Sequence, residues 1–260
     1  MRKNGIAAAF ANNKAFIAYL MAGDPSLEKT REYILTIAGA GADIIEIGIP
    51  FSDPVAEGET IQKAGLRALA SKTRPVRIFE MIASLKGEIS APLLLMTYIN
   101  PVFNYGYDKF FAECAECGVD GVIIPDLPFE EHGEILTFCE KYGTVLISLI
   151  APLSGDRIGM IAEKAKGYIY LVSSMGVTGV RNEITTDIVS MMREIKKYTC
   201  VPVAVGFGVQ SPEQAASLSK SADGVITGSA IVNIISEYGD NATPALEKYV
   251  RSMKSAVMNP

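Results

Sequence analysis

Short runs of β-branched and other apolar residues alternate along the chain with longer stretches of helical periodicity. The longer stretches carry apolar residues at i, i+3 and i+4, which is the spacing of one helix face. Helices are therefore expected at Leu27–Ala40, Ala56–Ala70, Tyr107–Cys117, Glu130–Tyr142, Asp156–Lys166, Asp187–Tyr198 and Glu213–Lys220. The short runs predict eight strands, at Phe16–Met21, Ile44–Ile49, Pro92–Thr97, Gly121–Ile124, Thr144–Leu149, Tyr168–Ser173, Pro202–Gly206 and Gly224–Thr227.

This alternation predicts parallel βαβ units with right-handed crossovers. Eight such units in 260 residues match the size of a (β/α)8 TIM barrel. A doubly wound open sheet is the alternative, but it usually carries a glycine-rich dinucleotide turn after its first strand. Here that turn reads Gly23-Asp24-Pro25 and lacks the G-x-G-x-x-G pattern. No Gly/Ser- or Pro-rich linker divides the chain, so we expect one TIM-barrel domain over residues 1–260.

Composition and charge narrow the class of protein. Hydrophobic residues make up 49% and charged residues 20%, as in a globular protein with a proper core. The net charge of −5 argues against a nucleic-acid or anionic-membrane partner, since either would need clustered Lys and Arg. No apolar run approaches a membrane span, and the N-terminal apolar stretch is too brief for a signal peptide. A cytoplasmic location is expected.

The four cysteines do not predict a metal site. Cys114 and Cys117 form a C-x-x-C, but the surrounding segment has a helical pattern. A zinc site needs about four ligands at suitable spacing, and the single histidine, His132, has no partner in the sequence. We therefore expect reduced, structural cysteines and no metal.

Glu46 is the first candidate for chemistry, because it interrupts a run of isoleucines in the second expected strand. Side chains alternate along a strand, so Ile45, Ile47 and Ile49 share one face while Glu46 lies on the other. If the isoleucine face meets the helices, Glu46 points into the barrel. Apolar surroundings raise a carboxyl pKa, which suits a group that both donates and accepts a proton. A structural carboxylate paired with a buried base is the alternative.

Three glycine-rich loops follow the last three expected strands. They are Gly176-Val177-Thr178-Gly179, Gly206-Phe207-Gly208 and Gly228-Ser229, and the last also begins a helix. Glycine lets backbone N–H groups converge on an anion, and a helix N-terminus favours phosphate. Because barrel phosphate sites usually lie after strands seven and eight, these loops predict a phosphate site.

Two further residues are ambiguous from their own pattern. Glu57 lies at the start of an expected helix, where an acid often serves only to complement the helix dipole. Tyr170 lies within the sixth expected strand, where a tyrosine more often packs in the core than takes part in catalysis.

The motifs together resemble those of the tryptophan synthase alpha subunit family. The matching segments occur in order along essentially the whole chain, at Glu46–Pro54, Met96–Val102, Pro125–Pro128, Gly176–Gly179, Val205–Val209 and Gly228–Val232. The resemblance implies cleavage of indole-3-glycerol phosphate to indole and glyceraldehyde 3-phosphate by a retro-aldol reaction. It assigns Glu46 as general acid/base and Glu57 as the second acid, which binds the indole N–H.

The resemblance also implies roles for the remaining residues. Tyr170 aligns with a tyrosine beside the catalytic glutamate, and Tyr19 and Phe207 are expected to wall the substrate. The expected phosphate-binding positions are Thr178, Gly179, Gly208, Gly228 and Ser229. One departure stands out, because the family usually has Ala-Asp-Gly-Pro where this chain has Ala56-Glu57-Gly58-Glu59.

The family resemblance further implies a partner and a division of cofactors. It predicts a heterotetramer with a beta subunit that alone carries pyridoxal phosphate, so no cofactor is expected on this chain. The loops at Ser52–Gly58 and Asn100–Gly106 would face that partner. Two alternatives remain open: a weakly active subunit that mainly activates the beta subunit, and a stand-alone lyase that releases free indole.

Overall fold

The computed structural model describes residues 5–11, 14–172, 184–206 and 208–260, with only the backbone of 184–187. In these ranges the strands are β1 Ala15–Met21, β2 Ile44–Gly48, β3 Leu93–Met96, β4 Gly121–Ile123, β5 Val145–Leu146, β6 Ser148–Ile150, β7 Ile169–Val172, β8 Val203–Gly206 and β9 Gly224–Thr227. The helices are α1 Gly5–Ala9, α2 Leu27–Gly39, α3 Glu59–Ala70, α4 Pro75–Ala83, α5 Ile99–Tyr105, α6 Tyr107–Cys117, α7 Gly133–Tyr142, α8 Ile158–Lys164, α9 Ile184–Ile195, α10 Pro212–Ser219, α11 Ser229–Tyr238 and α12 Thr243–Met258. Short 3-10 helices occur at η1 Phe129–Glu131, η2 Pro152–Arg157 and η3 Gly239–Asn241.

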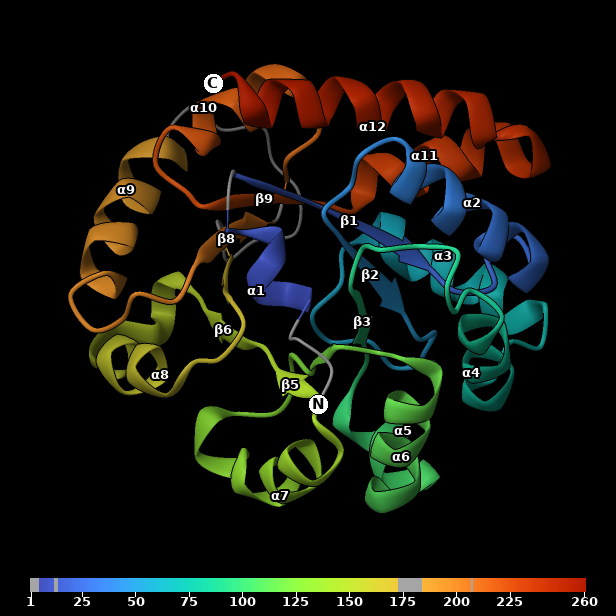
Figure 1. The fold of residues 1–260 in the computed structure, drawn as a ribbon, viewed down its shortest axis with the longest axis horizontal. Helices are drawn as coiled ribbons and strands as arrows, with labels where there is room; N and C mark the ends of the chain where they lie inside the picture. The colour runs from blue at the N-terminus through green and yellow to red at the C-terminus, as the bar shows by residue number, and fades with distance from the viewer. Residues whose placement is uncertain (1–4, 12–13, 173–183, 207) are drawn as a thin grey trace.

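The strands form one parallel sheet that closes through a single segment of the chain. The strand order is β5-β4-β3-β2-β1-β9-β8-β7-β6, and only Ile147 separates the two end strands in sequence. β5 pairs with β4 and β6 pairs with β7, while the Ile147 amide donates a hydrogen bond to Val122 O at 2.9 Å. The expected strand Thr144–Leu149 therefore corresponds to the two end strands of the sheet, and the continuous chain through them closes the barrel. The predicted (β/α)8 barrel with helices outside is confirmed (Figure 1).

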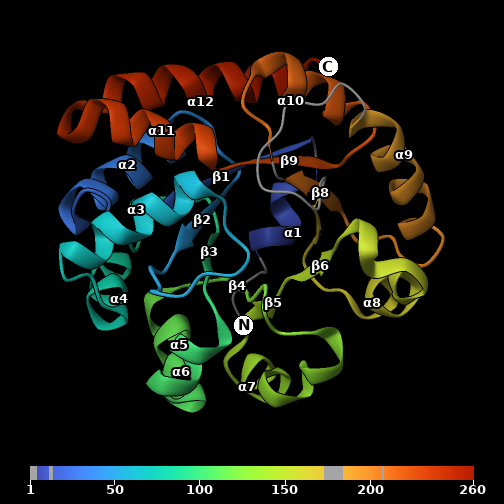
Figure 2. The ribbon, with the colours of Figure 1, turned by 180° about the vertical axis from the view of Figure 1, so that it is seen from behind.

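The two ends of the barrel differ. Helix α1 covers the end at which the strands begin, because Ile6 belongs to the interior cluster and a Cβ on Gly5 would contact Pro92, just before β3. In Figure 1 this helix lies in the middle of the ring of strands. Figure 2 views the other end, with the segment that joins β2 to α3 in the foreground. The carboxyl ends of the strands, where barrel active sites lie, are therefore on that side.

Alternation along β2 sorts its side chains between two apolar layers. Ile45, Ile47 and Ile49 pack in the layer between the sheet and the helices. Ile44 belongs to the barrel interior, and Glu46 is buried on the same face of the strand. The predicted orientation of Glu46 is confirmed.

Several helices differ from the sequence-based expectation. Helix α3 begins at Glu59 rather than Ala56, because Gly58 has an extended ψ of 166° and serves as its N-cap. Residues 99–105 form α5, so the expected loop at Asn100–Gly106 is wrong for most of its length. Helices α4 and α12 were not expected either. Both have proline in the first turn, where its missing N–H costs no helical hydrogen bond.

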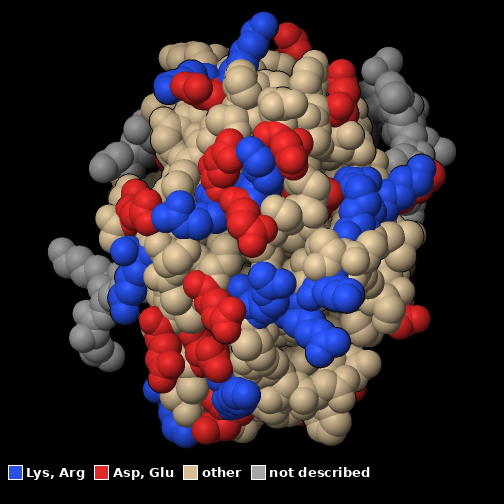
Figure 3. Space-filling view, turned by 90° about the vertical axis from the view of Figure 1, so that its right-hand side faces the viewer, with Lys and Arg blue, Asp and Glu red and all other residues tan. Residues whose placement is uncertain are grey.

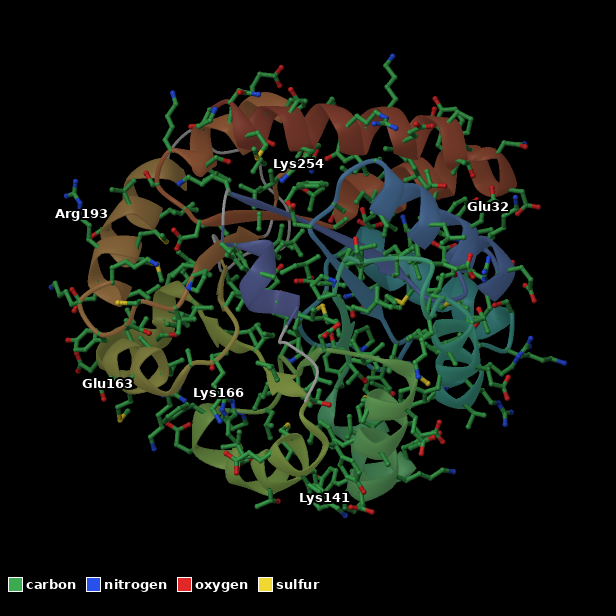
Figure 4. The ribbon with its side chains drawn as sticks, viewed as in Figure 1. Glu32, Lys141, Glu163, Lys166, Arg193 and Lys254 are labelled. Carbon is green, nitrogen blue, oxygen red and sulfur yellow. The ribbon has the colours of Figure 1, made fainter. Side chains whose placement is uncertain are left out.

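Charged side chains on the outer surface pair locally. On the face in Figure 3, acidic and basic side chains lie next to one another rather than in separate fields. Lys141 and Lys166, both labelled in Figure 4, are exposed and pair with Asp108 at 2.6 Å and Glu140 at 3.3 Å. Such exposed pairs contribute little to stability. Lys254 is less exposed, and its ion pair with Asp43 at 2.7 Å joins α12 to the start of β2.

The cysteines are free thiols. Cys114, Cys117 and Cys139 are buried in the layer between sheet and helices, and Cys114 and Cys117 lie on α6, as their pattern predicts. Cys200 is exposed, so it takes no part in the core.

Candidate active site

Glu46 is buried in the barrel, where one described residue is its strong hydrogen-bond partner. Its side chain is 1% exposed, and the Tyr168 hydroxyl donates a hydrogen bond to Glu46 Oε1 at 2.6 Å. Burial raises the pKa of Glu46 to about 7, while the Tyr168 hydrogen bond works in the opposite direction. Within the described ranges its partner is thus a neutral phenol rather than a base, and no ion pair of Glu46 occurs there. A carboxyl with this pKa can both give and take a proton near neutral pH.

Tyr168 was not among the residues expected at the site. It immediately precedes β7, and its side chain reaches Glu46 across the barrel interior, 122 residues away in sequence. Alternation along the strand places Tyr168 on the same face as Tyr170, which was the only signal available. Both belong to the interior cluster.

Glu57 lies beside Tyr98 in the segment between β2 and α3. Because α3 begins two residues later, the alternative of a first-turn helix acid is wrong. Burial raises the pKa of Glu57 to about 7, and a hydrogen bond from Tyr98 partly offsets this rise. The Tyr98 hydroxyl also accepts from the Ala56 amide at 3.2 Å, and its ring packs on Phe51 at 5.4 Å between centroids. Tyr98 therefore anchors this segment at three points.

Glu59, the other departure in this segment, turns away from the barrel. It is exposed and pairs with Lys63 at 2.7 Å, one helical turn along α3. Its charge is thereby held at the surface of the helix rather than directed toward Glu57.

Two interior tyrosines fill space left by glycines on neighbouring strands. Tyr19 is in register with Glu46, and a Cβ on Gly48 would stand 2.1 Å from the Tyr19 hydroxyl. Tyr170 lies against Gly206 in the same way, at 2.4 Å. Burial raises the pKa of both tyrosines well above the usual range, so both hydroxyls stay protonated.

The expected phosphate positions are described in part. Gly208 has φ +82°, a backbone conformation that favours glycine. Gly228 is the N-cap of α11 and Ser229 its first residue, so the prediction that this loop begins a helix is confirmed. Thr178, Gly179 and Phe207 lie outside the described residues. Gly228 also lies close to Tyr19, since a Cβ there would stand 3.1 Å from Tyr19 Cδ1.

The site thus combines the buried Glu46 and the half-buried Glu57 with four tyrosines of the barrel interior and the strand ends. The acids come from β2 and the segment after it; the tyrosines are Tyr19, Tyr98, Tyr168 and Tyr170. Two carboxyls with raised pKa values in one region of a barrel are typical of an acid/base site. Within the part of the chain that the structure describes, no group of three or more His, Cys, Asp or Glu side chains could hold a metal ion.

Comparison with known proteins points to one family. The sequence profile of the tryptophan synthase alpha chain matches residues 7–258. The tryptophan synthase alpha chain of Lacticaseibacillus casei is 46% identical over 257 residues, covering 99% of this chain and 97% of the relative. That of Lactiplantibacillus plantarum is 47% identical over 249 residues, covering 95% and 94%.

Solved structures agree. The tryptophan synthase subunit alpha of Legionella pneumophila superposes with a TM-score of 0.90 at 34% identity, covering 99% of this chain and 100% of that one. A chain from the tryptophan synthase a2b2 complex of Pyrococcus furiosus gives a TM-score of 0.87 at 38% identity, covering 94% and 98%.

Proposed function

The chain belongs to the tryptophan synthase alpha chain family, and we propose that it cleaves indole-3-glycerol phosphate to indole and glyceraldehyde 3-phosphate by a retro-aldol reaction. The family makes it a lyase of tryptophan biosynthesis. The observation that carries the proposed reaction is the pair of carboxyls in this region, the buried Glu46 and the half-buried Glu57, each with a pKa of about 7.

Glu46 is the general acid/base in this proposal. It first protonates the indole ring carbon that carries the glycerol side chain, and the ring then becomes an indolenine-like electron sink. The ionised carboxylate next takes the proton of the adjacent glycerol hydroxyl as the carbon–carbon bond breaks. One group must act in both directions, which a pKa near the working pH allows. Tyr170, buried near Glu46, is proposed to contact the reacting part of the substrate.

Glu57 is the second acid. As a carboxylate it accepts a hydrogen bond from the indole N–H and stabilises the positive charge of the protonated ring. The segment that carries it is fixed by Tyr98, through the Ala56 amide and the packing on Phe51. This anchoring supports a defined position for Glu57 although its side chain is one methylene longer than the usual aspartate.

The phosphate is proposed to bind at Thr178, Gly179, Gly208, Gly228 and Ser229. The support is the start of α11 at Ser229, where free backbone N–H groups face an incoming anion. Tyr19 and Phe207 are proposed to wall the indole-glycerol portion. Tyr19 is well placed for this because its ring lies between Gly228 and Gly48.

The proposed partner is a tryptophan synthase beta subunit, in a heterotetramer that carries pyridoxal phosphate only in the beta chains. The support from this chain is two strongly exposed apolar side chains in the segments expected to face the partner. Val55 is 78% exposed and Phe103 65%. A cytoplasmic location is proposed from the family; no helix in the described ranges is long and apolar enough to cross a membrane.

Glu57 and Glu59 motivate a second candidate, a weakly active subunit kept mainly to activate the beta subunit. A stand-alone lyase is the third. Indole release from indole-3-glycerol phosphate, assayed with and without beta subunit, separates them. We expect turnover that rises in the complex. High turnover alone would favour the stand-alone lyase, and beta activation without cleavage would favour the activator.

A further inference from the structure

Tyr19 carries a buried hydroxyl that lacks a strong partner among the described residues. The side chain is 4% exposed, and the one hydrogen bond of its hydroxyl in these ranges goes to Met21 Sδ at 4.0 Å. A thioether sulfur is a weak acceptor. By contrast, the Tyr168 hydroxyl has a carboxylate partner at 2.6 Å. A buried donor left almost unpaired lowers stability, so its retention needs a reason.

The position of this hydroxyl relates it to both acids. Tyr19 is in register with Glu46 on the neighbouring strand, and its hydroxyl lies against Gly48, two residues further along the same face. Among the ionisable groups that raise the pKa of Tyr19 after burial, Glu57 acts most strongly, and Glu46 also contributes. The ring passes Gly228, at the start of α11. These contacts bring the hydroxyl into the region that the proposed function assigns to the substrate, next to the strand that carries Glu46.

We propose that Tyr19 is a further catalytic residue: its hydroxyl donates a hydrogen bond to the glycerol oxygen that becomes the aldehyde oxygen. This inference rests on the proposed function and goes beyond a role in walling the substrate. In the cleavage step the hydroxyl proton of the substrate passes to Glu46, and the O–H electron pair forms the C=O bond. The carbon–carbon pair returns to the indole ring and neutralises its nitrogen.

During this step the oxygen carries partial negative charge before the C=O bond is complete. A fixed neutral donor stabilises that charge more than it stabilises the starting alcohol, which is the condition for a rate effect. Tyr19 keeps its own proton throughout, as its raised pKa requires. The substrate oxygen also supplies the strong acceptor that the hydroxyl does not have among the described residues.

Replacing Tyr19 with Phe tests this role, because Tyr19→Phe removes only the hydroxyl. We expect kcat to fall about tenfold or more, as for other donors to a developing oxyanion. The affinity for a substrate analogue with a plain propyl phosphate chain should stay within about twofold, since it has no glycerol oxygen. The variant should be as stable as wild type or more stable, because the donor that it loses has only a thioether as hydrogen-bond partner in the described ranges.

Tyr33→Phe is the matched control. Its hydroxyl donates to Gly239 O at 2.5 Å in the outer layer, so its loss should reduce stability without changing kcat. The proposal is overturned if Tyr19→Phe keeps kcat within about twofold, if analogue binding falls as much as kcat, or if the variant is destabilised like Tyr33→Phe. A wild-type chain that releases no indole, alone or with beta subunit, would instead overturn the proposed function itself.

Discussion

The ring of Tyr170 occupies the space in which a side chain on Gly206 would lie. A Cβ on Gly206 would stand 2.4 Å from the Tyr170 hydroxyl oxygen and 2.7 Å from Cε1. Tyr170 lies on β7 and Gly206 on the neighbouring β8. Glycine at this position therefore allows Tyr170 to point into the barrel beside Glu46.

Gly206→Ala should displace Tyr170, lowering stability by about 1–3 kcal/mol as overpacking does in other cores. Indole release should fall about tenfold or more, since Tyr170 leaves the proposed site. Combining it with Tyr170→Ala in a double-mutant cycle, measured by urea unfolding, should give a total loss smaller than the sum. Purely additive losses would show that the two residues do not compete for space.

Glu46→Gln should abolish cleavage while the fold is kept. The amide matches the carboxyl in shape but cannot shuttle a proton, a function typically worth about 10²–10⁴-fold in rate. Indole release measures the loss, and binding of the propyl phosphate analogue checks that the pocket remains intact. Wild-type turnover by this variant would remove Glu46 from the mechanism.

The same variant should change how stability depends on pH. Burial raises the pKa of Glu46 from 4.5 to about 7, so the folded protein keeps a proton that the unfolded chain has lost in this interval. The contribution is fully present below pH 4.5 and is lost as pH rises through about 7. Glu46→Gln avoids this loss and should exceed wild type in stability by up to about 3 kcal/mol at pH 8, because each pKa unit corresponds to ~1.4 kcal/mol. Denaturant unfolding at pH 4.5 and pH 8 gives the comparison; a constant difference would contradict it.

Tyr168→Phe should shift the pH–rate profile. The Tyr168 hydroxyl stabilises the ionised form of Glu46 and so lowers its pKa, which means that the variant should have a still higher pKa there. The limb of the kcat/KM profile that reports Glu46 should move to higher pH. Tyr105→Phe, whose hydroxyl bonds Glu113 outside the site, serves as the control and should not move it. An unshifted limb in Tyr168→Phe would mean that another group titrates.

Catalysis should tolerate shortening of the Glu57 side chain to that of aspartate but not removal of its carboxyl. Glu57→Ala should be nearly inactive, because the indole N–H loses its acceptor. Glu57→Asp should keep or raise turnover, since it restores the usual reach of the family and a misplacement of ~1 Å can cost ~10²-fold. Both variants are assayed alone and with beta subunit. An alanine variant as active as wild type would exclude Glu57 from catalysis and favour the activator role.

Much of the barrel could be predicted because its strands carry strong local signals. The isoleucines of β2 predicted both the strand and the inward direction of Glu46. The boundary of α3 was missed because the residue pattern alone does not show the extended backbone of Gly58. Helix α5 was missed since its Asn-Pro pair is typical of turns, although proline is tolerated in a first helical turn.

The partners of the acids could not be predicted from the sequence. Periodicity places Tyr168 on the inner face, but the distance between β7 and β2 across the barrel depends on how the whole sheet closes. The same holds for Tyr98 and Glu57, which meet only because the segment after β2 folds back over β3. A sequence can therefore indicate a single candidate side chain such as Glu46. A contact between residues far apart in the chain, such as that of Tyr168 with Glu46, is seen only in the folded structure.

The span of 122 residues between Glu46 and Tyr168 has a consequence for synthesis of the chain. The ribosome synthesises β2 long before β7, and β1 can pair with its second neighbouring strand, β9, only after β9 has emerged. Until then the half-built sheet has open edges, and water reaches the carboxyl of Glu46, which stays ionised. Glu46 therefore acquires the proton for its first turnover late, when the last strands of the sheet exclude water from its carboxyl.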